Sequence, residues 1–574
     1  MAWYSWMFIF ASRMISAPGR SDTVGTEHSC GQVVGQLRVT LSRRQFVKRT
    51  GWLAGGAVAA ALVGCTEDKR PDRQQVQPTQ TADQQVPNPQ SVRRQTLQQV
   101  ATQRQRPDPE PAEPVEQAGK TNSAVQQAGV EQPDAQTQQQ GRARPQPARP
   151  ESPAERRLLV PDVVQDGHEL QDPAFEPISG ARVEYGDIDG AGYRIEMPEQ
   201  WNGDLVLWAH GFRGLDEEGT GFSRRLTFDD IPARDVIIGQ GYGWATSTYR
   251  VNGYVPGVGV DDLLRVKDRV AELARPPRRT YIAGGSMGGA TAQLMAQEFP
   301  GEIAAALAFC PAMGNVWVVD YIAAWHALSH WLIGEPPSRL DVDGMLVWAE
   351  ALGTSHGSGL LLTPLGEQFA ALIKTFTGGE RWGFDDGLRQ QWDIVFSLGV
   401  TIWPDVVESG SPGPGEVIPV SRELPPADTR EHIYSADPVA GIDVQRLNEE
   451  VIRFGSDPDR RHDPGVGIPT GELRAPMLAL KTTGDLFTPI HLDRDYQRML
   501  QESGWERNLV VQTVRRAGHC TFSEREALAG FTAIVSWLSF GFAPAGDDLQ
   551  GDLSLVGTRF TDPFDEDDPL RPEG

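Results

Sequence analysis

Two stretches in the first half of the chain alternate between apolar and polar positions, which is the period of a half-buried strand. Residues 181–185 and 193–197 carry this pattern and predict two antiparallel strands. The runs 205–209 and 243–247 are apolar without alternation, as expected of strands buried on both faces. Between residues 261 and 274 the apolar positions form one helical stripe, so a helix is predicted there.

Strands and helices continue to alternate in two further blocks. Their predicted order is strand 280–283, helix 290–299, strand 303–309, and then, beyond residue 470, strand 477–481, helix 491–503, strand 508–514 and helix 524–540. Strands that alternate with helices indicate a parallel sheet covered by helices. The predicted fold class is therefore α/β.

A glycine-rich turn lies between a predicted strand and a predicted helix. Residues 284–288 read Gly-Gly-Ser-Met-Gly, a G-x-S-x-G pattern. Such a turn is so tight that the neighbours of the serine must be small, and the helix dipole favours negative charge that develops there. In a chain with 61 glycines the pattern alone is a weak signal. Its position makes Ser286 the candidate nucleophile, against the alternative of a purely structural turn.

Two further polar residues follow predicted strands. Asp485 lies in the turn after strand 477–481, and His519 follows the last predicted core strand. A serine nucleophile needs a histidine that accepts its proton and an acid that orients the histidine. The alternatives are a turn-forming aspartate and a structural histidine. Asp493 and Asp495 are substitute acids, but both fall in a predicted helix, where we expect surface charges.

The loop after strand 205–209 reads His210-Gly211-Phe212. Acyl transfer needs backbone N–H groups directed at the carbonyl oxygen that becomes an oxyanion. A donor from this loop would act together with the N–H of Met287, which follows the candidate nucleophile. We expect His210 to orient the loop rather than to act as a base.

These motifs, in the order Ser286, Asp485, His519, resemble the α/β-hydrolase superfamily over roughly residues 180–310 and 472–540. The resemblance implies the α/β-hydrolase fold, an eight-stranded and mostly parallel sheet with one antiparallel strand and helices on both faces.

The roles of individual residues follow from the same resemblance. It implies a serine nucleophile, a histidine that acts as general base and acid, an orienting aspartate and an oxyanion hole. The corresponding residues are Ser286, His519 and Asp485, with the N–H groups of Phe212 and Met287. Arg213 follows the oxyanion loop, where many members have Pro or Gly. This departure disfavours the lipase-like and epoxide-hydrolase branches.

The candidate nucleophile and acid are 199 residues apart. Two strand–helix units need roughly 60–80 residues, so over a hundred are inserted. We expect a mainly helical cap over residues 311–471. Seven tryptophans lie in it: Trp317, Trp325, Trp331, Trp348, Trp382, Trp392 and Trp403. They could line an aromatic subsite, but for most of them a place in the core of the cap is favoured.

The distribution of charge along the chain argues against one class of function. Residues 1–157 hold 20 basic and 14 acidic residues, and residues 158–574 hold 33 and 63, a balance of -30. A folded body with this negative charge repels phosphate backbones, which argues against nucleic-acid binding.

Among the four cysteines, Cys310 and Cys520 both follow strands near the candidate site. They could pair, but two free thiols are favoured. No motif has metal-ligand spacing, and we expect no cofactor.

The N-terminal region resembles an export signal. Residues 42–48 read Ser-Arg-Arg-Gln-Phe-Val-Lys, similar to a twin-arginine motif, and a weakly apolar run 51–64 follows. The run ends in Leu-Val-Gly-Cys, which resembles a lipobox with Cys65 as the acylated residue. Residues 66–157 are rich in Gln and Pro and lack aromatic residues, which is typical of a disordered tether.

The predicted organisation is a signal region 1–65, a tether 66–157, a first part of the hydrolase core 158–310, a cap insertion 311–471, a second part of the core 472–542 and an acidic C-terminal tail 543–574. We predict an exported, lipid-anchored serine hydrolase that cleaves small carboxylic esters through an acyl-enzyme. An aminopeptidase or oligopeptidase of the same fold, acting on short peptides, is the alternative enzyme. A catalytically silent binding lipoprotein is the alternative from another class.

Overall fold

The computed structural model describes residues 180–213, 233–336, 342–356, 359–401, 412–420 and 425–562. The twin-arginine motif, Cys65 and the predicted tether lie outside the described residues. Within the described ranges, no helix is both long and apolar enough to cross a membrane.

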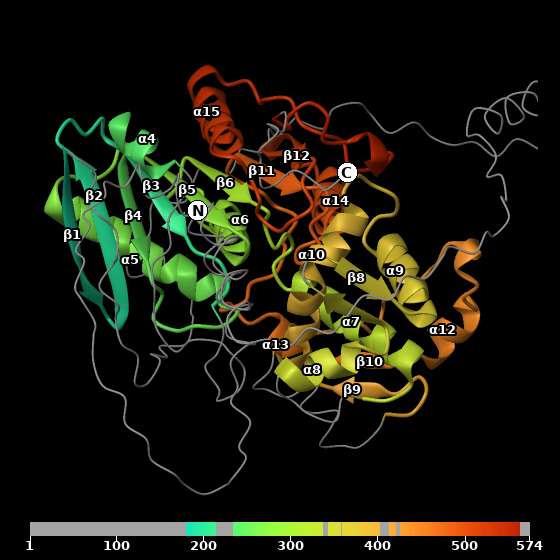
Figure 1. Ribbon diagram of the computed structural model, residues 1–574. Helices are drawn as coiled ribbons and strands as arrows, with labels where there is room; N and C mark the ends of the chain where they lie inside the picture. The colour runs from blue at the N-terminus through green and yellow to red at the C-terminus, as the bar shows by residue number, and fades with distance from the viewer. Residues whose placement is uncertain are drawn as a thin grey trace, which may run out of the picture. The chain divides into compact units, whose positions relative to one another are not determined.

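One eight-stranded sheet forms the centre of the fold, in the order β1-β2-β4-β3-β5-β6-β11-β12 (Figure 1). The strands are β1 (Ala181–Ile188), β2 (Ala191–Pro198), β3 (Asp204–Ala209), β4 (Gly243–Ser247), β5 (Arg279–Gly285), β6 (Ala305–Phe309), β11 (Met477–Thr482) and β12 (Leu509–Val514). Strand β2 is antiparallel to both of its neighbours, and every other pair is parallel. The predicted sheet with one antiparallel strand is therefore confirmed.

Successive residues of a buried strand point to opposite faces of the sheet, and each face has its own hydrophobic core. Leu205 and Leu207 of β3 pack on one side, whereas Val206 and Trp208 pack on the other. The first face is covered by α5 (Pro256–Leu273), α6 (Met287–Glu298) and α14 (Ile490–Ser503); the second is covered by α4 (Arg234–Gly239) and α15 (Glu524–Phe540). This double burial explains why the strands are apolar without alternation.

Two helices begin earlier than the sequence pattern predicts. Helix α5 starts at Pro256. Proline has no backbone N–H, and in the first turn of a helix that N–H would have no intrahelical partner. Helix α6 starts at Met287, immediately after Ser286. Glycines fill its first turn, so the apolar pattern becomes visible only further along the helix.

The segment between β6 and β11 forms the cap, which is mainly helical as predicted. Its elements are α7 (Trp317–Ile333), α8 (Val342–Ala349), β7 (Gly353–His356), β8 (Gly359–Leu362), α9 (Pro364–Phe376), α10 (Phe384–Ser397), β9 (Val417–Pro419), α12 (Val444–Glu450), β10 (Arg453–Gly455) and α13 (Pro458–Arg461). Trp325 and Trp392 are buried against Phe369 and Phe396. These two tryptophans build the core of the cap, the interpretation favoured from the sequence.

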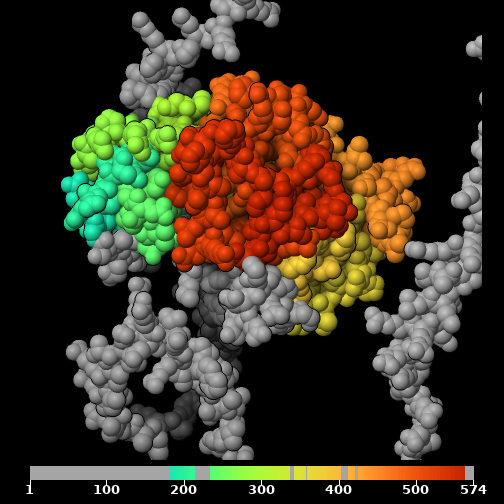
Figure 2. Space-filling model, turned by 90° about the horizontal axis from the view of Figure 1, so that it is seen from above, coloured from blue at the N-terminus to red at the C-terminus, as the bar shows by residue number. Residues whose placement is uncertain are grey.

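The chain beyond α15 packs against the edge strand β12. The backbone N–H of Asp547 donates to Val511 O at 2.7 Å, and its carboxylate accepts from the Thr513 N–H at 2.9 Å. Leu549 and Leu553 are buried beside them. In the space-filling view the C-terminal part of the described chain, in red, covers one face of the folded body (Figure 2). The first twenty residues of the predicted tail therefore belong to the folded body.

Candidate active site

Ser286 occupies a strained turn between β5 and α6. Its φ is +58° and its ψ is -120°, a region that L-residues rarely adopt. A Cβ on Gly284 would lie 2.2 Å from Gly288 O, and a Cβ on Gly288 would lie 2.0 Å from Ala209 O. Both positions therefore require glycine. The turn leaves Ser286 at the N-terminus of α6 and on the wall of a pocket.

Asp485 and His519 are directly hydrogen bonded, with 2.8 Å between Asp485 Oδ2 and His519 Nδ1. The carboxylate is fully buried and also accepts from the N–H groups of Phe487 and Thr488 and from the Thr488 hydroxyl, at 2.8, 3.0 and 2.9 Å. Burial acts to raise the pKa of Asp485, but the charges of His519 and Lys481 and these hydrogen bonds hold it below its ordinary value. The site therefore contains an ionised acid that orients an imidazole.

The loops that carry Ser286 and His519 are both attached to the end of β6. The Ser286 N–H donates to Phe309 O at 2.9 Å. A disulfide joins Cys310 to Cys520, beside His519, with the Cα atoms 5.2 Å apart. The prediction that Cys310 and Cys520 are free thiols is therefore wrong. Strands β6 and β12 bring these two residues, 210 positions apart in the sequence, into contact range. Within the described part of the chain, His519 Nε2 has no protein hydrogen-bond partner.

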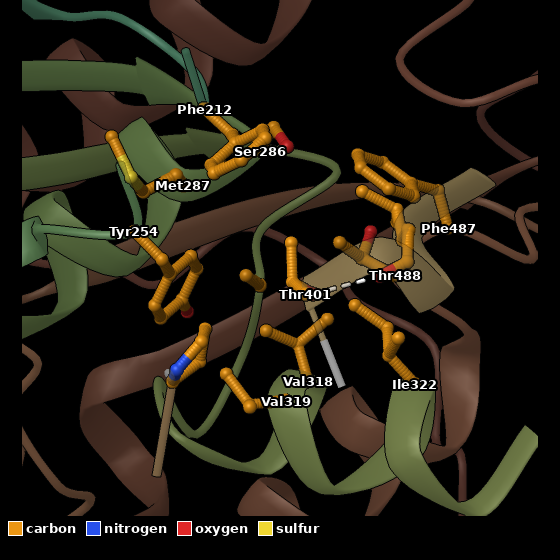
Figure 3. A pocket seen from close by; sticks show the side chains of 13 residues that line it. Phe212, Tyr254, Ser286, Met287, Val318, Val319, Ile322, Thr401, Phe487 and Thr488 are labelled. Carbon is orange, nitrogen blue, oxygen red and sulfur yellow. Dashed lines mark hydrogen bonds between the residues drawn. The ribbon is translucent and has the colours of Figure 1, made fainter. Parts of the chain in front are cut away.

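The predicted oxyanion loop lies directly against the serine. A Cβ on Gly211 would be 3.4 Å from Ser286 Cβ. His210 is buried, with its ring nitrogens 2.7 Å from Gly211 O and 3.0 Å from Thr248 O, and its ring stacks on Tyr249. This residue therefore holds the loop in place. Phe212 and Met287 lie beside Ser286 on the pocket wall (Figure 3). The Met287 N–H is in the first turn of α6, where helices leave amides without intrahelical partners.

The pocket in front of Ser286 is apolar, and its space together with the adjoining open solvent amounts to about 540 Å³. Helix α7 of the cap contributes one wall, and the loop after Asp485 contributes another (Figure 3). Its lining residues are Phe212, Tyr254, Ser286, Met287, Ala312, Val318, Val319, Ile322, Leu398, Thr401, Pro425, Phe487 and Thr488. Among these described residues none carries a charge, and none is a tryptophan. A neutral, apolar group is the natural occupant.

One of the two substitute acids is not a surface residue. Asp493 is fully buried in α14, with its Oδ2 3.1 Å from Lys481 Nζ, whereas Asp495 is part-exposed and pairs with Arg498. The expectation of a surface charge at Asp493 is therefore wrong. Its helix face packs on β11, and the apolar pattern does not reveal that a lysine lies opposite. Burial raises the pKa of Asp493 to about 6, although Lys481 opposes this shift.

Gln391 of α10 is a site residue that the sequence did not reveal. Its amide Nε2 donates to Gly484 O at 3.0 Å and to Ala517 O at 2.9 Å, which belong to the loops of Asp485 and His519. Its Oε1 accepts from the N–H groups of Leu486 and Phe487 at 2.9 and 3.0 Å. A single buried cap residue therefore ties both loops together.

The chain has distant similarity to several known proteins. No family model matches the chain. An o-phthalyl amidase of Xanthobacter agilis is 23% identical over 446 residues, which cover 68% of this chain and 95% of that protein. The solved structures that resemble this one include feruloyl esterase B of Aspergillus oryzae (TM-score 0.36, 12% identity, 62% of this chain and 78% of that chain).

Two further solved structures share the likeness. Est1E of Butyrivibrio proteoclasticus has a TM-score of 0.28 and 14% identity, over 63% of this chain and 100% of that chain. An acylaminoacyl peptidase of Pyrococcus horikoshii has a TM-score of 0.32 and 12% identity, over 64% of this chain and 43% of that chain. The strand order, the single antiparallel strand and the serine turn after β5 define the α/β-hydrolase fold.

Proposed function

We propose that the chain is a serine hydrolase that cleaves carboxylic esters through an acyl-enzyme. The observation that carries the proposal is the hydrogen bond between Asp485 and His519, at 2.8 Å, together with a serine held in a strained turn on the pocket wall. The strained backbone of Ser286 and the burial of the Asp485 carboxylate both cost stability. Their presence in one structure, with Ser286 on the wall of an apolar pocket, favours catalysis over a structural role. A silent binding protein has no need of either.

The mechanism assigns one role to each group. Ser286 Oγ attacks the acyl carbon while His519 Nε2 accepts its proton, and Asp485 stabilises the resulting imidazolium. The N–H groups of Phe212 and Met287 donate to the oxyanion. The imidazolium then gives its proton to the leaving group, and an acyl-enzyme forms on Ser286. Water, activated by His519, hydrolyses this ester and regenerates the serine.

The lining of the pocket supports neutral substrates with apolar or aromatic acyl groups. An aminopeptidase needs an acidic group for the substrate's amino end, and the described pocket lining offers none. Amide hydrolysis is the second candidate. It is supported by the o-phthalyl amidase, which matches this chain along 95% of its own length.

A substrate panel tests these candidates. The full chain is assayed with p-nitrophenyl acetate and p-nitrophenyl benzoate, with the matching acetyl and benzoyl anilides, and with a 2-carboxybenzoyl anilide. We expect hydrolysis of the benzoate ester, and hydrolysis of the anilides would favour the amidase. Ser286→Ala should lose at least ~1,000-fold in turnover. The matched control Ser539→Ala, at an exposed site on α15, should stay within about twofold. Ser286→Ala with more than a tenth of the activity would reject the serine mechanism.

We also propose that the enzyme is an exported lipoprotein that acts outside the cytoplasm at a membrane. The twin-arginine and lipobox motifs support this, together with the Gln/Pro-rich segment that separates Cys65 from the folded body. Cys65→Ser should release the protein from membranes or stop its processing. An unmodified Cys65 in the mature wild-type protein, with preceding residues still attached, would contradict this proposal.

A further inference from the structure

A buried lysine lies between two buried aspartates behind the candidate triad. Lys481 of β11 is inaccessible to solvent, and its Nζ is 3.1 Å from Asp493 Oδ2 and 3.9 Å from Asp485 Oδ2. The ammonium also donates to the Thr488 hydroxyl at 2.9 Å and to Pro311 O at 3.3 Å. The cation thus faces both carboxylates but is closer to Asp493, the one that does not contact His519.

Two titratable side chains around this cluster are uncharged, and a third forms an ion pair outside it. Tyr321 of α7 donates to Leu486 O at 2.7 Å, and burial raises its pKa, so it is neutral. Burial holds the pKa of His491 well below its ordinary value, so this histidine of α14 is also uncharged. Arg494 of the same helix pairs with Asp495 outside the cluster, at 3.5 Å.

Arg381, in the turn after α9, adds a second cation near Asp485. Its guanidinium donates to Thr483 O and to Gly379 O, at 2.8 and 3.0 Å, and to the Thr377 hydroxyl at 3.0 Å. Two buried cations, Lys481 and Arg381, therefore interact electrostatically with Asp485 before His519 acquires a proton. Positive charge at this place opposes an imidazolium, because the interior screens charges weakly.

We propose that Asp493 is a positioning residue of the triad, which pairs with Lys481 and so leaves the charge of Asp485 available to His519. The inference rests on the proposed function. With Asp493 ionised, the Lys481 charge is offset at 3.1 Å, and Asp485 Oδ2 accepts from His519 Nδ1 at 2.8 Å. Without that offset, Lys481 competes with His519 for the same oxygen.

Loss of Asp493 and loss of Lys481 should therefore have different effects on the pH dependence of activity. Asp493→Asn leaves an uncompensated cation, so the imidazolium is less stable. The acidic limb of the kcat/KM profile should move lower by up to about one pH unit, because Asp493 is ionised only above about pH 6. On the plateau, where Asp493 is ionised, kcat should fall about tenfold, the equivalent of one pKa unit. Lys481→Met removes the cation, and the buried Asp493 then takes up a proton. In this variant the limb should stay in place or move higher.

The double variant Lys481→Met/Asp493→Asn separates charge balance from packing. In this variant the acidic limb of the kcat/KM profile should lie at the wild-type pH or higher, because the charges of Lys481 and Asp493 are both gone. Asp495→Asn on the same helix is the matched control and should keep kcat within about twofold, since this residue is part-exposed. All variants are measured as the full chain with p-nitrophenyl benzoate, after their unfolding curves have shown that they are folded.

Two results would overturn the inference. One is an Asp493→Asn variant with an unchanged limb and a plateau within twofold of wild type; the other is a double variant no better than Asp493→Asn. If Asp493→Asn does not fold, a limb that moves lower in Lys481→Met also refutes it. The activity of Ser286→Ala shows whether the proposed function or only the role of Asp493 has failed. If it remains active, the proposed function fails, whereas if it is inactive and the pH profiles do not move, only the role of Asp493 fails.

Discussion

Gln391 offers the sharpest structural test, because one side chain of the cap joins the loops of Asp485 and His519. We consider Gln391→Leu, which keeps the volume of the side chain and removes its hydrogen-bonding groups. Gly484 O, Ala517 O and the Leu486 N–H then lose their amide partner, and all three lie in the buried seam between α10 and the core. The Phe487 N–H retains its bond to Asp485 Oδ1 at 2.8 Å, so this donor stays satisfied.

The expected cost follows from counting the groups left unpaired. Each buried backbone group without a partner costs about 1–3 kcal/mol, so three of them predict a loss of at least about 3 kcal/mol. Movement there is restricted, because a Cβ on Gly387 would lie only 1.8 Å from Gly484 O. Since the same loops hold Asp485 and His519, we also expect kcat to fall at least ~10-fold, because small misplacements of catalytic groups are costly.

Urea unfolding gives the change in unfolding free energy, and hydrolysis of p-nitrophenyl benzoate gives kcat. The matched control is Gln390→Leu, the exposed neighbour in the same helix, which should change stability by less than about 0.5 kcal/mol. A Gln391→Leu variant within 1 kcal/mol of wild type, with unchanged kcat, would refute the view that Gln391 holds the two loops.

Replacement of Cys310 and Cys520 by alanine should lower the unfolding free energy by up to about 5 kcal/mol, because the bridge closes a loop of 210 residues in the unfolded chain. Urea unfolding with and without reductant measures this, and identical midpoints would contradict it. His326 is buried in the cap, and burial lowers its pKa to about 3. The unfolded chain, with an ordinary pKa near 6.5, then binds the proton more tightly, so stability is lost as the pH falls below about 6.5. Wild type should lose about 2 kcal/mol more than His326→Phe between pH 7 and pH 5, and equal losses would show that His326 does not titrate on unfolding.

Local patterns determined the elements of the core. Apolar runs and helical stripes are set by which faces of a segment are buried, so they located β3, β4, β5, β11 and β12 within a residue or two. The turn around Ser286 was equally local, because a tight strand-to-helix turn excludes side chains on its neighbours. The order of Ser286, Asp485 and His519 along the chain then predicted a triad at one edge of the sheet, and the structure shows the hydrogen bond between Asp485 and His519.

Only the tertiary structure decided what surrounds these residues. The sequence pattern of its helix predicts that Asp493 is a surface charge. In the structure Asp493 is buried against Lys481 from the strand β11. Gln391 precedes Asp485 by more than ninety residues, and Cys310 and Cys520 are 210 positions apart. Periodicity reports whether a position faces the interior, but a charge, an amide or a thiol gains its role from the one group opposite it. That partner is set by how the cap and the strands pack, which no local pattern encodes.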